Sequence, residues 1–163
     1  MKINHNDVIY DIGAGTGSCS VEFAQHAYSG KVYAFEQNLE AVKAIELNKK
    51  KFTLNNLYII QGDGNVTIKD AETPTKVFIG GSSGKLHAML DTIYSKNSTC
   101  RVVITAITLE TLSEIMEYYK AKENYKLDIV NVSVARGKEL GNYHLMMAQN
   151  PIYIATITSK EEK

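Results

Sequence analysis

Residue types that mark metal-binding, disulfide-stabilised and nucleic-acid-binding proteins are scarce in this sequence. The 163 residues contain two cysteines, Cys19 and Cys100, which form no C-x-x-C pair, so we expect reduced thiols rather than a zinc site or a disulfide framework. Eighteen basic and eighteen acidic side chains cancel, which gives no support to bulk electrostatic attraction to nucleic acid or membrane. With no run of about eighteen apolar residues and no signal-peptide pattern, the chain is expected to be cytoplasmic.

The composition is that of one globular domain. Hydrophobic residues make up 44% of the chain and charged residues 22%, and 163 residues are enough for a substantial core. We therefore expect residues 1–163 to form a single domain. Only two of the eighteen cations are arginines, Arg101 and Arg136, so each is a candidate for a specific role.

The most informative stretch is residues 8–17, Val-Ile-Tyr-Asp-Ile-Gly-Ala-Gly-Thr-Gly. Its first five residues form a short apolar run, which is typical of a buried parallel strand. Three glycines at alternate positions then allow a tight turn into a helix over 18–27. A second apolar strand over 31–35 ends in Glu36, whose carboxylate can accept hydrogen bonds from both hydroxyls of a ribose.

The glycine spacing distinguishes two classes of ligand. A dinucleotide fold prefers G-x-G-x-x-G, which would need glycine at Ser18, whereas this chain has G-x-G-x-G preceded by Asp11. The pattern resembles motif I of class I S-adenosyl-L-methionine-dependent methyltransferases, which implies that cofactor, with Asp11 near its ammonium group. The alternative is an ordinary glycine turn of an α/β protein. The candidate cofactor-binding residues are Asp11, Gly13, Ala14, Gly15, Thr16, Gly17, Glu36, Asp63 and Gly64.

Two later turns also fall where parallel strands are expected to end. Asp63 and Gly64 follow a strand over 57–60, and Asp63 can hydrogen-bond an adenine amine or serve as an Asx-turn residue. A strand over 76–79 leads into residues 80–84, Gly-Gly-Ser-Ser-Gly. Three glycines in five residues indicate that something bulky passes close to this backbone. The candidate substrate-binding residues are Gly80, Gly81, Ser82, Gly84 and Arg136.

The remaining pattern predicts a seven-stranded, mostly parallel, doubly wound α/β sheet with the last strand antiparallel. Helices are expected from Asn38 to about residue 52, over 86–93 and from Thr108 or Thr111. Their predicted inward faces are Leu39, Ala41, Val42 and Ile45 in the first, Leu86, Met89, Leu90 and Ile93 in the second, and Leu112, Ile115, Met116 and Tyr119 in the third. Strand five is expected over 101–106, a long strand six over 126–135, an irregular polar segment over 136–144 and a final strand over 151–158. The expected strand order is that of class I methyltransferases, 3-2-1-4-5-7-6.

A narrower resemblance covers nearly the whole chain. Its motifs are Asp-Ile-Gly-Ala-Gly-Thr-Gly at 11–17, Val-Phe-Ile-Gly-Gly-Ser-Ser-Gly at 77–84, Val-Ile-Thr-Ala-Ile-Thr-Leu-Glu-Thr at 103–111, Val-Ala-Arg-Gly-Lys-Glu-Leu at 134–140 and Met-Met-Ala-Gln-Asn-Pro at 146–151. They resemble the decarboxylating cobalt-precorrin-6B/precorrin-8 methyltransferases of anaerobic cobalamin biosynthesis. The chain departs from that family at Ser83, where the family often has glycine, and in lacking an upstream segment that helps cover the cofactor. We expect an excerpt of a longer chain.

The resemblance implies a Rossmann-like C-methyltransferase that methylates carbon 15 of a precorrin and removes carbon dioxide from the ring C acetate. A flat macrocycle suits glycine backbone at 80–84, and its carboxylates need cations such as Arg136, with Lys138 and His144 as possible helpers. The alternative for Arg136 is a surface ion pair with Glu139. The electron-rich macrocycle supplies the nucleophile, so no catalytic acid or base is assigned, and no metal site is expected.

Several alternatives stay open at the level of sequence. One is an RNA or protein N-methyltransferase. Enzymes of this kind that act on the amino nitrogens of bases usually have Asn/Asp-Pro-Pro-Tyr after strand four, where this chain has Ile-Gly-Gly-Ser. An isoaspartyl or small-molecule O-methyltransferase, an inactive cofactor-binding fragment and an NAD-dependent oxidoreductase are further alternatives. The family resemblance also implies a tetrapyrrole substrate, a homo-oligomer such as a tetramer, and pairing with a second precorrin methyltransferase.

Overall fold

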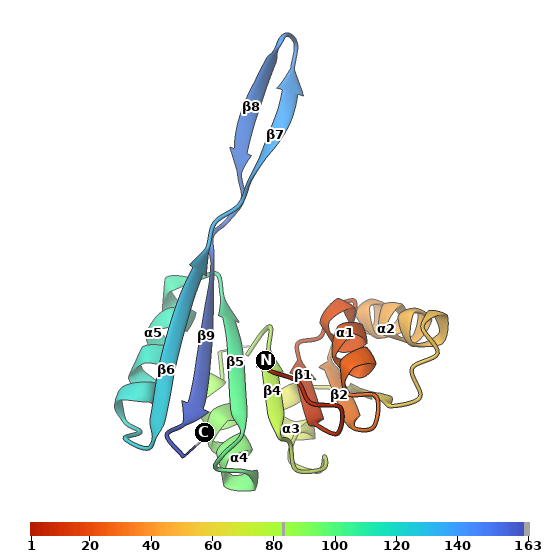
Figure 1. Ribbon diagram of the computed structural model, residues 1–163, viewed down its shortest axis with the longest axis vertical. Coiled ribbons are helices and arrows are strands. Elements are labelled where there is room, and N and C mark those ends of the chain that lie inside the picture. Colours follow the sequence, from red (N-terminus) through yellow and green to blue (C-terminus); the bar gives the residue numbers. More distant parts are fainter. Residues whose placement is uncertain (83, 162–163) are drawn as a thin grey trace.

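A computed structural model of the chain describes residues 1–82 and 84–161. Strands and helices alternate as far as residue 120, and only strands follow in the rest of the described chain (Figure 1). The elements are β1 (Val8–Ile12), α1 (Ser18–His26), β2 (Lys31–Glu36), α2 (Leu39–Lys51), β3 (Leu57–Gln61), α3 (Gly64–Thr67), β4 (Lys76–Ile79), α4 (Leu86–Lys96), β5 (Arg101–Ala106), α5 (Leu109–Lys120), β6 (Tyr125–Val132), β7 (Ala135–Leu140), β8 (Tyr143–Ala148) and β9 (Ile152–Ser159).

The main sheet has seven strands in the order β3-β2-β1-β4-β5-β9-β6. Strands β1 to β5 pair in parallel, and β9 runs antiparallel to both β5 and β6. With β9 counted as the seventh strand of this sheet, the predicted order 3-2-1-4-5-7-6 is confirmed. Because β9 opposes both of its neighbours, β6 is parallel to the other five strands and ends at the same edge of the sheet.

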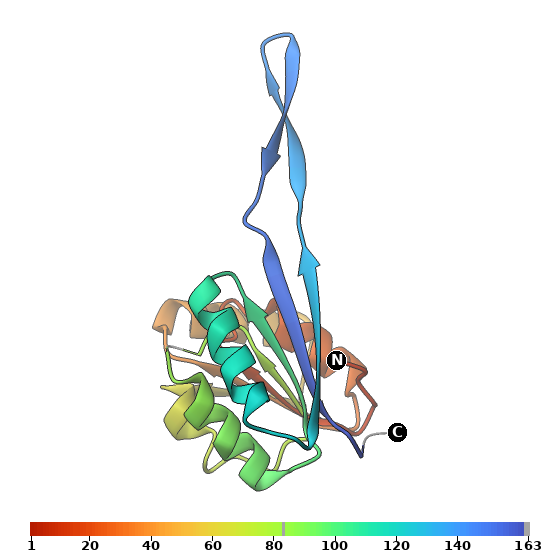
Figure 2. The ribbon, with the colours of Figure 1, turned by 90° about the vertical axis from the view of Figure 1, so that its left-hand side faces the viewer.

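Helices cover the sheet from both sides, as the doubly wound prediction requires (Figures 1 and 2). On one face Val21, Phe23 and Ile45 of α1 and α2 belong to a core with Ile9 and Val32. On the other face α4 and α5 pack on a larger core, to which β1 contributes the intervening side chains Tyr10 and Ile12. Since successive strand residues point to opposite faces, a strand with apolar residues at every position is buried on both sides.

Most of the predicted helix ends and buried helix faces are confirmed. The side chain of Asn38 accepts hydrogen bonds from the first turn of α2, and Thr108 accepts one from the Thr111 N–H at the start of α5. The predicted inward face of α4 is buried at all four positions, Leu86, Met89, Leu90 and Ile93. In α5, however, Tyr118 rather than Tyr119 is buried, and Leu39 of α2 is exposed.

The prediction was wrong for residues 133–144. Strand β6 ends at Val132, and the segment predicted to be irregular forms a regular antiparallel hairpin of β7 and β8 that projects from the body (Figures 1 and 2). We call residues 133–151 the arm. Its two-residue turn, Gly141-Asn142, has Gly141 at φ +61°, a conformation that glycine adopts without steric cost and that suits tight hairpins. The short helix α3 was also not predicted.

Candidate functional site

The glycine turn after β1 is fixed by hydrogen bonds to β2. The N–H groups of Gly13 and Ala14 both donate to the carbonyl of Phe35, at 3.0 and 3.2 Å. The three glycines have φ values of +71°, +56° and +80°, a region that side chains disfavour. Gly17 directly precedes α1, so the turn delivers the chain into the helix as the spacing predicted.

Two glycine loops touch each other at the ends of β1 and β4. A Cβ atom on Gly13 would lie 2.9 Å from the backbone nitrogen of Gly81, and one on Gly80 would lie 3.1 Å from the carbonyl oxygen of Gly13. The sequence indicated that something bulky passes close to the backbone of residues 80–84. At Gly80 this neighbour is the backbone of the first glycine loop. A Cβ on Gly81 would meet no described atom within 4 Å, so space remains beside that residue.

Glu36 closes the other side of the first loop. Its Oε2 accepts a hydrogen bond from the Gly15 N–H at 2.8 Å, and its Oε1 accepts one from the Asn38 N–H at 2.9 Å. Each oxygen keeps a further acceptor position. The carboxylate therefore lies at the end of β2, next to the glycine turn, with room to accept additional hydrogen bonds.

Asp11 is a buried carboxyl group with an unsatisfied oxygen. Its side chain is 1% exposed; Oδ2 accepts a hydrogen bond from Ser20, whereas Oδ1 has no partner among the described residues. Burial raises the pKa of Asp11 to about 6, the nearby Glu36 adds to that rise, and the Ser20 hydroxyl opposes it. A buried acceptor without a donor is costly, so this atom fits a ligand donor or an ordered water.

Asp63 holds the loop after β3. It caps α3 by accepting from the Asn65 N–H and side-chain amide, both at 2.9 Å, and forms a 3.0 Å ion pair with Lys85. The hydrogen bonds from Asn65, followed by that from Lys85, lower the pKa of Asp63 to about 2. The Asx-type role that the sequence left open is thus present. Gly64 is required sterically as well, because a Cβ there would lie 2.8 Å from the Ile12 side chain.

These loops enclose a hollow of 150 Å³ at the carboxyl edge of the sheet. Of the predicted residues, Gly13, Glu36, Asp63, Gly64, Gly81 and Ser82 line it. Sequence reasoning missed Gln37, Gly62 and Asn65, although each lies one residue from a predicted one. It also missed Ile12, Phe35 and Met89, which serve both the core and the hollow and therefore carry only a core signal.

A second hollow of 190 Å³ adjoins the first and shares Gly81 and Ser82 with it. Its other walls come from the ends of β4 and β5 and from the start of α5. They carry the hydroxyl groups of Thr105, Thr108 and Thr111, which the sequence analysis had not assigned to a site. The signal available for them was their position directly after a buried strand, where ligands bind in open α/β sheets. The complete lining is Ile79, Gly80, Gly81, Ser82, Ile104, Thr105, Ile107, Thr108 and Thr111.

The structure does not bring two predicted substrate residues into these hollows. Gly84, at φ +72°, borders a separate hollow beside α4, and its neighbour Ser83 lies outside the described residues. Arg136 lies on the exposed arm. The alternative ion pair of Arg136 with Glu139 is not formed: these residues point to opposite faces of β7, and Glu139 faces His144 across the hairpin at 3.4 Å.

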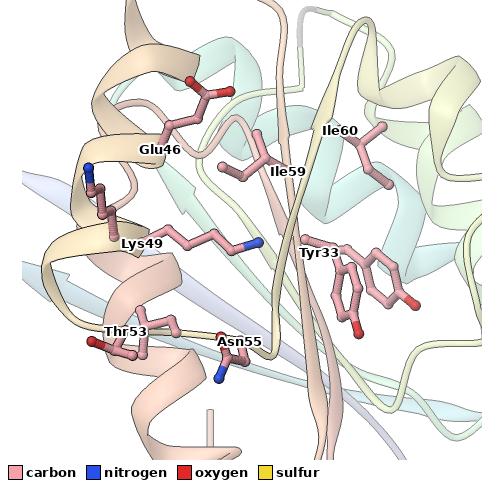
Figure 3. Close-up of a pocket in the computed structure, with 10 residues that line it drawn as sticks. Tyr33, Glu46, Lys49, Thr53, Asn55, Ile59 and Ile60 are labelled. Atoms are coloured by element: carbon pink, nitrogen blue, oxygen red, sulfur yellow. The ribbon is translucent and has the colours of Figure 1, made fainter.

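A larger hollow of 760 Å³ lies at the edge strand β3, next to the end of α2 (Figure 3). Tyr33, Tyr58 and Ile60 line it together with Lys49 near the end of α2. It contains none of the glycine loops or the strand-end carboxylates, so its size does not make it the candidate site. Among residues 1–82 and 84–161 there is no cluster of three potential metal ligands, and none of the helices is long and apolar enough to cross a membrane.

Comparison with known proteins agrees with this geometry. The family model for the precorrin methyltransferase domain matches residues 1–159. A probable cobalt-precorrin-6B C(15)-methyltransferase (decarboxylating) of Methanococcus maripaludis is 34% identical over 98% of this chain and 85% of its own length, and the corresponding Saccharolobus solfataricus protein is 33% identical over 94% and 79%.

Solved structures give the same result. The precorrin-6y C5,15-methyltransferase of Geobacter metallireducens has a TM-score of 0.87 and 31% identity over 97% of this chain and 83% of its own. The precorrin 8W decarboxylase of Methanobacterium thermoautotrophicum has a TM-score of 0.83 and 31% identity over 94% and 82%. An O-methyltransferase of Thermotoga maritima, at 18% identity and a TM-score of 0.72 over 99% of this chain and 63% of its own, shares the fold. The chain belongs to the precorrin methyltransferase family and has its class I methyltransferase fold.

Proposed function

We propose that this protein is a cytoplasmic S-adenosyl-L-methionine-dependent C-methyltransferase of cobalamin biosynthesis. In this proposal it methylates a precorrin macrocycle at carbon 15, with decarboxylation of the ring C acetate. The observation that carries the proposal is the pair of adjoining hollows that share Gly81 and Ser82, because methyl transfer needs a donor and an acceptor in contact. The names of the relatives supply the identity of the acceptor.

The first hollow fits the cofactor. Glu36 lines it and suits the ribose hydroxyls. Asp11 is buried behind Ile12 and Gly13 of the lining and is not itself part of it, and its unsatisfied Oδ1 suits an ammonium donor reached directly or through a water. Asp63 and Gly64 also line this hollow, and we assign them to the adenine. Ala14, Gly15, Thr16 and Gly17 form the turn that shapes this end of the site. When bound, the cofactor supplies an electrophilic methyl group on a sulfonium.

The second hollow fits one edge of a flat acceptor. The backbone of Gly80 and Gly81 separates the two hollows without side chains, and the three threonine hydroxyls can hydrogen-bond polar substituents. No carboxylate, imidazole or amine lines this hollow within the described chain. Alignment of the reactants and exclusion of water are therefore the contributions that these residues can make, and in ideal cases they lower a barrier by about 7–11 kcal/mol.

The Geobacter relative is named a C5,15-methyltransferase, and this name refers to two carbons of the macrocycle. We propose that this chain acts alongside a second precorrin methyltransferase that modifies the other carbon. This pairing would place successive methylations of one macrocycle on neighbouring proteins.

The decisive experiment has a binding arm and a turnover arm. Calorimetric titration should show S-adenosylhomocysteine binding and no binding of NAD. Glu36→Ala should weaken that binding by about 1.5–3 kcal/mol, since charge-assisted hydrogen bonds are lost. Turnover of a decarboxylatable precorrin should then release one carbon dioxide per methyl transferred. Binding of the cofactor product without tetrapyrrole turnover would contradict the assigned acceptor, and failure of a folded protein to bind it would contradict the cofactor site.

A further inference from the structure

A buried serine lies on the inner face of α1, which is otherwise apolar. The buried residues of this helix are Ser20, Val21, Phe23 and Ala24, and Ser20 is 0% exposed. A hydroxyl group in an apolar environment costs free energy unless it has a hydrogen-bond partner. The partner here is the Asp11 carboxyl group on β1, whose Oδ2 accepts the hydrogen bond from Ser20. Ser20 therefore joins the first turn of α1 to the end of β1, beneath the glycine turn.

This contact makes the two carboxyl oxygens of Asp11 unequal. Ser20 occupies Oδ2, whereas Oδ1 has no partner among the described residues. Because the Asp11 side chain is buried, a donor for Oδ1 has to come from a ligand or an ordered water. A carboxyl group turns easily about its Cβ–Cγ bond. The hydrogen bond from Ser20 therefore fixes the plane in which Oδ1 presents its acceptor positions.

The groups that the described structure places against Asp11 are neutral or acidic. Its register neighbours on β2 and β4, an alanine and a phenylalanine, carry no charge. Glu36 at the end of β2 raises the pKa of Asp11, and Cys19 of α1 is a thiol whose own pKa is raised by burial and then by Asp11. The hydrogen bonds from the Ser20 side chain and backbone oppose burial and lower the pKa of Asp11. The ionised form of Asp11 in the ligand-free protein therefore depends on Ser20.

An ammonium group on the ligand would supply both a donor for Oδ1 and a positive charge. The methionine end of S-adenosyl-L-methionine carries such a group, and Asp11 lies directly behind the Ile12 and Gly13 lining of the first hollow. An opposite charge favours the ionised carboxyl group, so binding should release the proton that Asp11 holds at low pH. The affinity should therefore fall as the pH drops through about 6, the pKa of Asp11 in the ligand-free protein.

We propose that Ser20 is a positioning residue of the cofactor site, whose hydroxyl group keeps Asp11 ionised and leaves Oδ1 free for the ammonium group of the cofactor. The inference rests on the proposed function for the identity of the ligand. Ser20 is not part of the lining of the hollow, so it acts through Asp11 and not by contact with the cofactor. Its removal should change how binding depends on pH, whereas a purely structural role would weaken binding equally at every pH.

Calorimetric titration of Ser20→Ala with S-adenosylhomocysteine at several pH values tests this proposal. Loss of one hydrogen bond from a carboxylate raises its pKa by about one. The variant should then bind about eightfold less tightly than the wild type at pH 5.5, but less than about twofold less tightly at pH 7.5. In the ligand-free proteins the carbon-13 resonance of the Asp11 carboxyl group should titrate at about pH 6 in the wild type and at a higher pH in Ser20→Ala.

Three controls separate the possible causes. Ser18→Ala removes an exposed hydroxyl group of the same helix and should leave the affinity and its pH dependence unchanged. 5′-Methylthioadenosine keeps the adenosine and the thioether but lacks the ammonium group, so it should bind the wild type and Ser20→Ala equally well at each pH. In an Asp11→Asn background, Ser20→Ala should change the S-adenosylhomocysteine affinity by less than about twofold, because the group through which Ser20 acts no longer titrates.

The outcomes are distinguishable from failure of the proposed function. If Ser20→Ala weakened S-adenosylhomocysteine binding equally at pH 5.5 and 7.5, or if Asp11 titrated at the same pH in both proteins, the role of Ser20 would be overturned while the cofactor site stood. An equal loss of affinity for methylthioadenosine would also overturn it, because Ser20 would then shape the site as a whole. If the folded wild type binds neither ligand, the proposed function fails, and the inference fails with it.

Discussion

The carboxyl edge of the sheet is built in opposite ways at its middle and at its β9–β6 end. Where β1 and β4 end, two glycine loops pack backbone against backbone, and Asp11 is enclosed beneath them. Where β6 and β9 meet the same edge, the chain leaves the body as the arm, and no residue between 128 and 151 is buried. The first region is defined by contacts within the chain, whereas the second presents surface that a single chain cannot cover. The same kind of substitution should therefore have different consequences in the two places.

The largest effect is expected for Gly13→Ala. The new Cβ would lie 2.9 Å from the backbone nitrogen of Gly81 at a φ of +71°, so crowding and backbone strain add, and the free energy of unfolding should fall by about 2–5 kcal/mol. Denaturant titration without ligand measures this. Gly15→Ala is the matched control: its φ is +56° but nothing described lies within 4 Å, so only about 1–2 kcal/mol should be lost. Equal losses would contradict the contact between the loops.

Asp11 should make the stability of the ligand-free protein depend on pH. Its pKa rises from 3.8 in the unfolded chain to about 6 in the folded one. The folding stability that the protonated carboxyl group contributes is therefore fully present below pH 4 and is lost as pH rises through 6. Asp11→Asn should therefore gain stability relative to the wild type over this range, by about 3 kcal/mol at neutral pH. Urea titrations of both proteins between pH 4 and 8 measure the difference, and a difference independent of pH would show that Asp11 does not titrate there.

A smaller effect is expected at Asp63, which lines the first hollow. Asp63→Ala removes the cap of α3 and should cost about 0.5–2 kcal/mol of unfolding free energy. Lys85→Ala removes only the exposed partner of the ion pair and should cost at most about 1 kcal/mol. Thermal unfolding of both variants tests the ranking. If Lys85→Ala were the more damaging, the ion pair rather than the cap would hold this loop.

The smallest effect is expected for Gly141→Ala at the tip of the arm. Its φ of +61° resembles that of Gly13, but a Cβ there would meet nothing described within 4 Å. In the monomer the hairpin can open without unfolding the body, so the global free energy of unfolding should change by less than about 0.5 kcal/mol. Unfolding at a protein concentration low enough to exclude assembly measures this. A loss comparable to that at Gly13 would mean that the arm folds as part of the body.

The contrast also explains where sequence reasoning succeeded. The strand order, the doubly wound layers, the caps Asn38 and Thr108 and the buried face of α4 all follow from short-range patterns that agree with one another. The hairpin of β7 and β8 was not predicted, because the residues around Lys138 are mostly polar. Gly141-Asn142 between two alternating segments is nevertheless a recognised hairpin signal. A polar run is typical of irregular structure, and exposed strands do not show the alternation that burial of one face imposes.

The sequence by itself determined the class of fold and the chemistry available at each strand end, because glycines, carboxylates and caps act on residues close to them in the chain. Only the tertiary structure decided that the loops after β1 and β4 meet at Gly13 and Gly81, that Asp11 keeps an unsatisfied oxygen, and that Thr105, Thr108 and Thr111 face a hollow next to the first. It also decided that Arg136 lies outside its own chain's hollow. These facts depend on which side chains converge from distant positions, and spacing along a chain does not encode distance across a sheet.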